Sequence, residues 1–169
     1  MLETIFERVI GHEGRYTDNP KDPGNWTGGK VGVGELKGTK WGLAAASYPH
    51  LDIESLTIET AYTEYSKWYQ ELRLHELPKV IQYQMFDAAF NHGMRRANKL
   101  LQSAVGAEVD GIVGRKTMAA VYACDEEDMV LRFLSERLEF FTNLEHFDEF
   151  GRGWSRRIAM NMKYAAEDN

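Results

Sequence analysis

The sequence predicts one predominantly helical α+β domain with a small antiparallel sheet near residues 15–43. Apolar residues recur at three- and four-residue intervals at the N-terminus and through most of residues 57–165, which is typical of amphipathic helices. Residues 15–40 are instead dense in Gly, Asn, Asp and Pro, a composition that favours turns and short strands. The 169 residues, 43% of them hydrophobic, suffice for one sizeable core and are few for two.

The first predicted helix carries an acid on its apolar side. At 100° per residue, Glu13 projects within about 20° of Leu2 and so continues the apolar stripe. If the helix extends that far, desolvation raises the pKa of the carboxyl group, as a general acid needs near neutral pH. If the helix ends at Gly11, Glu13 is an ordinary loop acid, and periodicity leaves both interpretations open. The stripe consists of Leu2, Ile5, Phe6, Val9 and Ile10.

The polar segment that follows supplies a possible second carboxylate. Glycoside hydrolysis requires a protonated acid and a carboxylate that activates water or attacks carbon. Asp18 and Asp22 lie in a segment that could fold back over the helix end. Residues 30–33 alternate in polarity and predict a short strand of the small sheet.

Helix signals return from residue 57. Thr57 is a predicted N-cap, Pro78 suits the first turn of the next helix, and Gly93 is a predicted C-terminal stop. Thr117 is a predicted cap for a later helix, and the glycines of residues 151–153 predict a break before the last one. The further helices are predicted at residues 97–105, 117–123, 129–144 and 154–165.

Charge and composition exclude several classes of protein. The net charge of -6 argues against nucleic acid as a partner. Cys124 is the single cysteine, so no internal disulfide forms, and the acidic run at residues 125–128 disfavours a thiolate nucleophile there. Charges throughout residues 1–11 do not fit a secretory signal, and no segment approaches the roughly 20 apolar residues of a membrane span. We therefore expect synthesis in a reducing cytoplasm.

A zinc site is also not expected. His12-Glu13 begins like the His-Glu-x-x-His motif of metalloproteases, but Tyr16 stands where the second histidine should be. The remaining histidines are scattered without ligand spacing. The prediction is therefore no metal and no organic cofactor.

Two motifs give these residues a family context. The segment from His12 to Tyr16, with Asp22-Pro23-Gly24 after it, resembles the Glu-Gly-Gly-Tyr and Asp-Pro-Gly-Gly signature of glycoside hydrolase family 108. That family comprises lysozyme-like muramidases, many of them phage endolysins. Residues 39–43 are similar to its Thr-Asn-Phe-Gly-Ile piece, which here follows a glycine-rich insertion at residues 25–38. Arg15 departs from the signature by replacing the second glycine.

The resemblance implies a lysozyme-like fold and a set of site residues. By analogy with T-even phage lysozymes, Glu13 would be the acid, Asp22 the water-orienting base and Thr39 a supporting hydroxyl. Thr27 is the rival for the last role because it is nearer to Asp22 in sequence. The aromatic members of the two motifs, Tyr16 and Trp41, would bind substrate.

The second half of the chain carries further candidates. Asp87 and Asn91 lie four residues apart on one predicted helix face, where they could line a sugar groove or simply pack and cap. The family has a similar Phe-Asp-x-x-x-Asn-x-Gly piece, which favours the groove. Residues 101–117 resemble the peptidoglycan-binding segment that accompanies family 108. Residues 1–85 and 86–165 are therefore the predicted catalytic and peptidoglycan-binding-like halves of a single globule, residues 1–169.

The C-terminal segment is aromatic and basic. Trp154 could stack on a sugar ring, but packing of the last helix is the more ordinary role for a tryptophan and is the favoured interpretation. A basic face could attract carboxylates of the cell wall or anionic lipid, or it could be a solvated helix face. Its residues are Arg152, Arg156 and Arg157.

The resemblance implies hydrolysis of the β-1,4 bond from N-acetylmuramic acid to N-acetylglucosamine in peptidoglycan, with inversion, for host cell lysis. It also implies a monomer that a holin releases from the host cytoplasm to the periplasm and cell wall. The alternatives are a lytic transglycosylase, which needs no water-activating Asp, and a non-catalytic wall-binding or virion protein, against which the presence of Glu13 argues.

Overall fold

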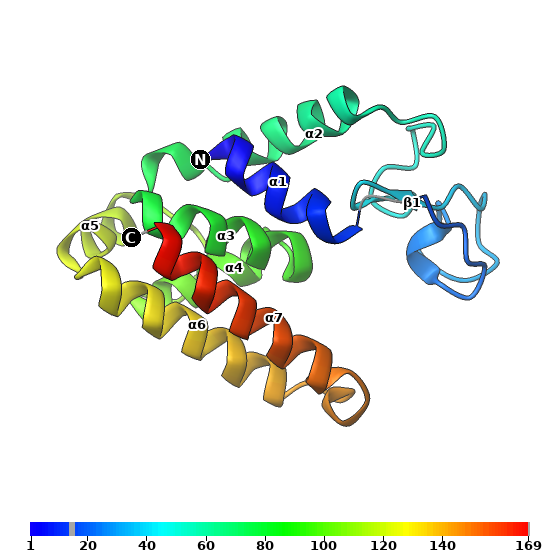
Figure 1. The fold of residues 1–169 in the computed structure, drawn as a ribbon. Helices are drawn as coiled ribbons and strands as arrows, with labels where there is room; N and C mark the ends of the chain where they lie inside the picture. Colours follow the sequence, from blue (N-terminus) through cyan, green and yellow to red (C-terminus); the bar gives the residue numbers. More distant parts are fainter. Residues whose placement is uncertain (14–15, 169) are drawn as a thin grey trace. The chain divides into compact units, whose positions relative to one another are not determined.

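The computed structural model describes residues 1–13 and 16–168, apart from the side chains of residues 11–13 (Figure 1). It is mostly helical with a two-stranded antiparallel sheet, which confirms the predicted fold class. The chain forms two compact units, the N-terminal unit of Leu2–Trp68 and the helical unit of Tyr69–Asn169 with Met1. The elements are α1 (Leu2–Glu13), η1 (Pro23–Asn25), β1 (Thr39–Lys40), β2 (Leu43–Ala44), α2 (Ile58–Glu71), η2 (Leu74–Glu76), α3 (Lys79–His92), α4 (Met94–Ala104), α5 (Arg115–Ala123), α6 (Glu126–Thr142) and α7 (Phe147–Asp168).

Aromatic contacts join the two helices of the N-terminal unit. The ring of Phe6 in α1 meets Tyr62 and Tyr65 of α2 edge to face, with centroids 4.9 and 5.6 Å apart. Thr57 caps α2 as predicted, because its hydroxyl accepts a hydrogen bond from the amide of Thr60 (3.2 Å). The first helix extends through Glu13, so the interpretation that it ends at Gly11 is wrong.

The sheet of this unit is smaller than the polar segment that contains it. Thr39 pairs with Ala44 across the two strands, and isolated bridges join Thr17 to Thr39 and Trp26 to Leu36. The strand predicted at residues 30–33 is wrong, because this stretch forms turns. Positive φ angles at Gly32 (77°) and Gly34 (81°) take the chain out of the extended conformation that a strand requires.

The core of the helical unit surrounds α3, which contacts α4, α6 and α7. Side chains on every side of α3 are buried, from Val80 to Ala89, so it is a central helix. Figure 1 shows α6 and α7 as neighbouring antiparallel helices. Gly93 ends α3 as predicted, with φ at 79° and its amide donating to the carbonyl of Ala89 (2.8 Å).

Two local predictions in this unit are wrong. Thr117 lies inside α5, which begins after Gly114, and its hydroxyl accepts a hydrogen bond from buried Gln102 (3.2 Å). Residues 151–153 continue α7 without a break. A Cβ at Gly151 would lie 2.8 Å from the ring of Phe147, so this glycine allows close packing inside the helix. Among the described residues, no helix is long and apolar enough to cross a bilayer.

Candidate active site

The predicted acid stands at the end of α1. The helix includes the backbone of Glu13, and the side chain of this residue lies outside the described part of the structure. Its proposed role as the acid therefore stays a prediction. Three residues separate Glu13 from Thr17, whose amide and carbonyl both bond to Thr39 (2.9 and 2.8 Å).

Asp22 begins the short helix η1 and is exposed. Its Oδ1 accepts a hydrogen bond from the amide of Gly24 (2.8 Å), which orients the carboxylate relative to the turn. The Pro at the first position of η1 suits this geometry because proline has no amide to satisfy. Within the described residues, no protein group bonds Oδ2 of Asp22, so this oxygen can bind water.

Buried Asn25 connects Asp22 to Thr39 and is not among the site residues predicted from the sequence. Its Oδ1 accepts a hydrogen bond from the Thr39 hydroxyl (2.7 Å), and its Nδ2 donates to the carbonyl of Asn19 (3.0 Å). Its own amide donates to the carbonyl of Asp22 (3.2 Å). A recognisable signal was present: Asn25 occupies the last position of the Asp-Pro-Gly-Gly signature, where an amide replaces glycine.

The rival threonine has a different role in the structure. The hydroxyl of Thr27 accepts the amide hydrogen of Glu35 (2.9 Å), and the amide of Thr27 donates to the Glu35 carbonyl (2.9 Å). These bonds close the base of the glycine-rich insertion. Thr39, in contrast, is connected to Asp22 through Asn25.

The two predicted aromatic contacts lie at different places in the N-terminal unit. Half-buried Tyr16 lines an open cavity of about 300 Å³ together with exposed His50, Asp52 and Glu54. Burial and the nearby carboxylates, including Asp18, raise the pKa of the Tyr16 hydroxyl. Trp41, with φ at 53°, is held by its carbonyl, which accepts the Tyr65 hydroxyl (2.8 Å).

Asp87 and Asn91 belong to the helical unit, where the structure places them in an ion-pair network. Asp87 is 5% exposed and its Oδ2 lies 2.9 Å from Nη1 of fully buried Arg137. Arg157 bonds Asn91 and lies 3.5 Å from Asp87, and Asn161 donates to Asp87 (2.8 Å). Burial opposes ionisation, but the two arginines and Asn161 outweigh it and lower the pKa of Asp87.

An open cavity of about 400 Å³ lies at the exposed edge of this network. Asn91 and Trp154 line it, as does His92, whose pKa is lowered to about 4 by burial and the neighbouring Arg137. The indole of Trp154 stacks on Phe141 with centroids 5.2 Å apart. One face of Trp154 therefore packs the last helix, and Asn91 is the exposed member of the predicted pair.

No group of three or more His, Cys, Asp or Glu side chains in the described ranges is placed to hold a metal ion. The hydrogen bonds described above divide the predicted site residues into two sets. Asp22 and Thr39 are connected in the N-terminal unit, and Asp87 and Asn91 are in contact in the helical unit.

A helix-rich chain whose first helix leads into a small polar sheet has the architecture of the lysozyme-like class. Residues 6–93 match the family Glycosyl hydrolase 108, and the chain belongs to this family. Residues 96–159 match the family described as Predicted Peptidoglycan domain. The two matches meet near Gly93, between α3 and α4.

The structure is also similar to that of SagA from Brucella abortus. The TM-score is 0.81 at 27% sequence identity, over 99% of this chain and 94% of that chain. The comparison with curated proteins gave no match. Together, the two family matches identify a glycoside hydrolase that degrades peptidoglycan, and the predicted family is confirmed.

Proposed function

We propose that this enzyme is an N-acetylmuramidase that hydrolyses the β-1,4 bond from N-acetylmuramic acid to N-acetylglucosamine. The observation that carries the proposal is the chain of hydrogen bonds from Asp22 through Asn25 to Thr39, which is paired with Thr17. Asn25 bonds the backbone carbonyl of Asp22 and the hydroxyl of Thr39, and the amide of Gly24 orients the Asp22 carboxylate, so the backbone of Asp22 and the Thr39 hydroxyl are held in one connected turn. Such fixed polar groups are what a glycosidase needs to hold a water molecule in place.

The length of the intervening chain limits the distance between Glu13 and Thr39. Four residue steps separate Glu13 from Thr17, and an extended chain covers at most about 14 Å in that number of steps. The end of α1 therefore cannot lie far from Thr39. This limit supports Glu13 as the acid that works with Asp22 and Thr39.

The proposed reaction is an inverting hydrolysis. Glu13 donates its proton to the glycosidic oxygen, which leaves as the hydroxyl of N-acetylglucosamine. Water bound to Oδ2 of Asp22 attacks the anomeric carbon of N-acetylmuramic acid and gives its proton to the carboxylate. Thr39 holds the water or the sugar beside it, and the aromatic rings of Tyr16 and Trp41 contact the glycan.

A lytic transglycosylase is the alternative because it also needs an acid but no water-activating carboxylate. The anchored, solvent-facing Asp22 favours hydrolysis. Mass spectrometry of digested peptidoglycan separates the two reactions. We expect products with reducing N-acetylmuramic acid ends, and 1,6-anhydro ends would contradict the proposal.

Variants test the assigned roles. Glu13→Gln and Asp22→Asn should each lower the rate of digestion by at least about 10²-fold, because each removes a proton-transfer group. Asp18→Asn is the matched control, since Asp18 is an exposed acid of the same segment. Thermal melting checks that each variant is folded. A Glu13→Gln enzyme with nearly wild-type activity would show that Glu13 is not the acid.

The two threonines can be separated in the same assay. Thr39→Val should lower activity and Thr27→Val should affect mainly the insertion, because only Thr39 is connected to Asp22 through Asn25. The reverse order of activities would assign the role to Thr27.

We further propose that the cleavage serves lysis of a bacterial host, with a holin giving the monomeric enzyme access to the wall. The family resemblance supports this role. Expression in bacteria should lyse the cells when a holin is co-expressed and leave them intact when the holin alone is omitted. Lysis without the holin would contradict the proposed route.

A further inference from the structure

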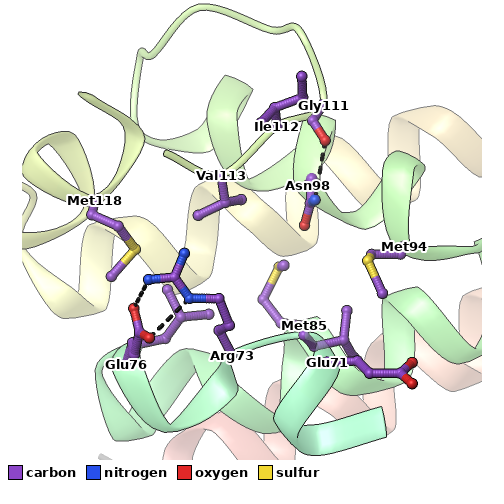
Figure 2. A pocket seen from close by; sticks show the side chains of 12 residues that line it. Glu71, Arg73, Glu76, Met85, Met94, Asn98, Gly111, Ile112, Val113 and Met118 are labelled. Atoms are coloured by element: carbon purple, nitrogen blue, oxygen red, sulfur yellow. Dashed lines mark hydrogen bonds and ion pairs between the residues drawn. The ribbon is translucent and has the colours of Figure 1, made fainter. Parts of the chain in front are cut away.

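A small pocket in the helical unit has a floor rich in methionine. Its volume is about 190 Å³, and it lies between η2, α3, α4 and the segment before α5 (Figure 2). Met85, Met94 and Met118 line it together with Val113 and Ile112. Because methionine is unbranched and polarizable, such a lining can adapt to small apolar groups of different shape. We call this cavity the methionine pocket.

Buried Gln102 holds the upper wall of the methionine pocket in place. Its amide nitrogen donates to Oδ1 of Asp110 (2.7 Å) and to the carbonyl of Ile112 (3.1 Å), and its oxygen accepts the amide hydrogen of Gly111 (2.7 Å). Asn98 also donates to the carbonyl of Gly111 (3.1 Å), a bond drawn in Figure 2. This wall keeps Ile112 71% exposed, although burying it would be favourable. Ile112 therefore presents apolar surface at the rim of the methionine pocket, where a ligand can cover it.

The rim of the methionine pocket carries charges of both signs. Nε of Arg73 donates to Oε1 of Glu76 (2.8 Å), and Figure 2 shows this ion pair beside Met118. Arg73, Glu76 and Met118 also line a second, more open depression of about 640 Å³ that continues to Arg115 and exposed Tyr122. Exposed Glu71 lines the methionine pocket, so an acid lies at one end of the combined surface and a base at the other.

We propose that the methionine pocket and the adjoining depression bind the stem peptide of peptidoglycan. This short chain combines small apolar side chains with carboxylates and one ammonium group. The proposal rests on the proposed function, because it takes peptidoglycan as the substrate. The apolar side chains contact the methionines and Ile112, the ammonium group is near Glu71, and a carboxylate is near Arg115.

Chemistry favours the peptide over the glycan. Pockets that enclose drug-sized molecules are about 300 Å³ or larger, so the methionine pocket of about 190 Å³ fits one residue-sized apolar group, and the adjoining depression of about 640 Å³ holds the rest of the peptide. The lining of the methionine pocket is aliphatic and methionine-rich, which suits an apolar side chain better than a sugar hydroxyl. The charges at the two ends match a ligand that carries both signs and do not match a neutral glycan.

The test uses the full chain with Glu13→Gln, so that no substrate is cleaved. The probe is the synthetic N-acetylated tetrapeptide acetyl-Ala-γ-Glu-diaminopimelate-Ala, whose one ammonium group is that of diaminopimelate, titrated by calorimetry and by NMR of backbone amides. We expect saturable binding with shifts confined to residues 71–76, 94–98 and 110–122. Neutral strands of N-acetylglucosamine are the competing probe, because glycan freed of peptide would carry the lactyl carboxylates of N-acetylmuramic acid. Equal affinity for these strands, or no shift in the three segments, would overturn the proposal.

Variants of exposed residues test the contacts with little risk to folding. Ile112→Ser should weaken the Kd about tenfold, because it removes an apolar contact that the peptide covers. Leu131→Ser is the matched control, since Leu131 is 63% exposed on α6 and lines neither depression. Equal affinities of the two variants would overturn the proposal.

A second set of variants tests the proposed contact between Glu71 and the ammonium group of the peptide. Glu71→Gln should weaken the Kd about threefold at low salt, and Glu139→Gln, an exposed acid of α6, should not. The effect of Glu71→Gln should disappear for a peptide with alanine in place of diaminopimelate. An unchanged effect with that peptide would contradict the placement of the ammonium group.

Binding and catalysis fail in different ways. If the wild type cleaves peptidoglycan and the tetrapeptide does not bind, the stem-peptide site is wrong and the muramidase proposal stands. If the tetrapeptide binds and no glycosidic bond is cleaved, the muramidase proposal is wrong and the stem-peptide site stands.

Discussion

Removing the negative charge of Asp87 should destabilise the helical unit strongly. Asp87→Asn keeps the size of the side chain but leaves Arg137, which is 0% exposed, without its counter-charge at 2.9 Å. Breaking a buried ion pair at one partner costs about 3–5 kcal/mol. For a chain of this size that loss corresponds to a decrease in Tm of about 6–20 °C. Urea titration followed by circular dichroism, with calorimetry, measures both quantities.

A double variant separates the cost of the unpaired charge from a general effect of mutation. Among the described residues, Nε and Nη1 of Arg137 have no hydrogen-bond partner with suitable geometry, although Nη1 is close to Asp87. The hydrogen-bonding capacity of the buried guanidinium is therefore only partly used. Asp87→Leu combined with Arg137→Met should therefore recover more than half of the lost stability, because no charge remains buried. A cost of less than about 1 kcal/mol for Asp87→Asn would contradict a buried, unpaired charge at Arg137. A double variant that is no more stable than Asp87→Asn would contradict it as well.

The same pair predicts a pH dependence. The arginines outweigh burial and lower the pKa of Asp87 in the folded state. Its contribution to stability is therefore complete above the ordinary pKa of about 3.9 and is lost as the pH falls through the lowered value. The difference in stability between wild type and Asp87→Asn should narrow in acid and stay constant at neutral pH.

His92 has its pKa lowered to about 4, so its contribution is complete above pH 6.5 and is lost as the pH falls toward 4. Wild type should lose more stability than His92→Phe when the pH falls from 7 to 4.5. The difference in the free energy of unfolding should be about 1–2 kcal/mol, a value reduced for the partial exposure of His92, and urea titrations at the two pH values measure it. Gly38→Ala should lower stability by about 2–4 kcal/mol, since φ is 80° and the new Cβ would lie 2.5 Å from the Thr17 carbonyl. Gly32→Ala, at φ 77° but with open space around it, is the control; equal losses of Tm would mean that the close approach to Thr17 has no effect.

Local signals were enough to predict most helices and several of their ends. Thr57 caps α2 and Gly93 ends α3 because these effects depend on bonds within a few residues. Periodicity left open whether the first helix reaches Glu13, and the structure shows that it does. Local signals failed at two positions. Gly151 lies within α7, where a Cβ would come too close to the ring of Phe147, and Thr117 lies inside α5 and does not cap it.

The candidate site was predictable as residue types and motifs, but its connections were not. No periodicity links Asn25 to Thr39, and their hydrogen bond exists because two turns bring them together. Asp87 and Arg137 lie on α3 and α6, and the sequence predicted only the local pair of Asp87 with Asn91.

What the sequence by itself determined was the helical class, the family and the identities of the candidate catalytic residues. These follow from periodicity and motifs, which depend on residues that are close together in the sequence. The tertiary structure alone decided which polar groups are buried together and where the methionine pocket lies. The physical reason is that burial and charge pairing depend on contacts between distant segments, whose free energy no local pattern specifies.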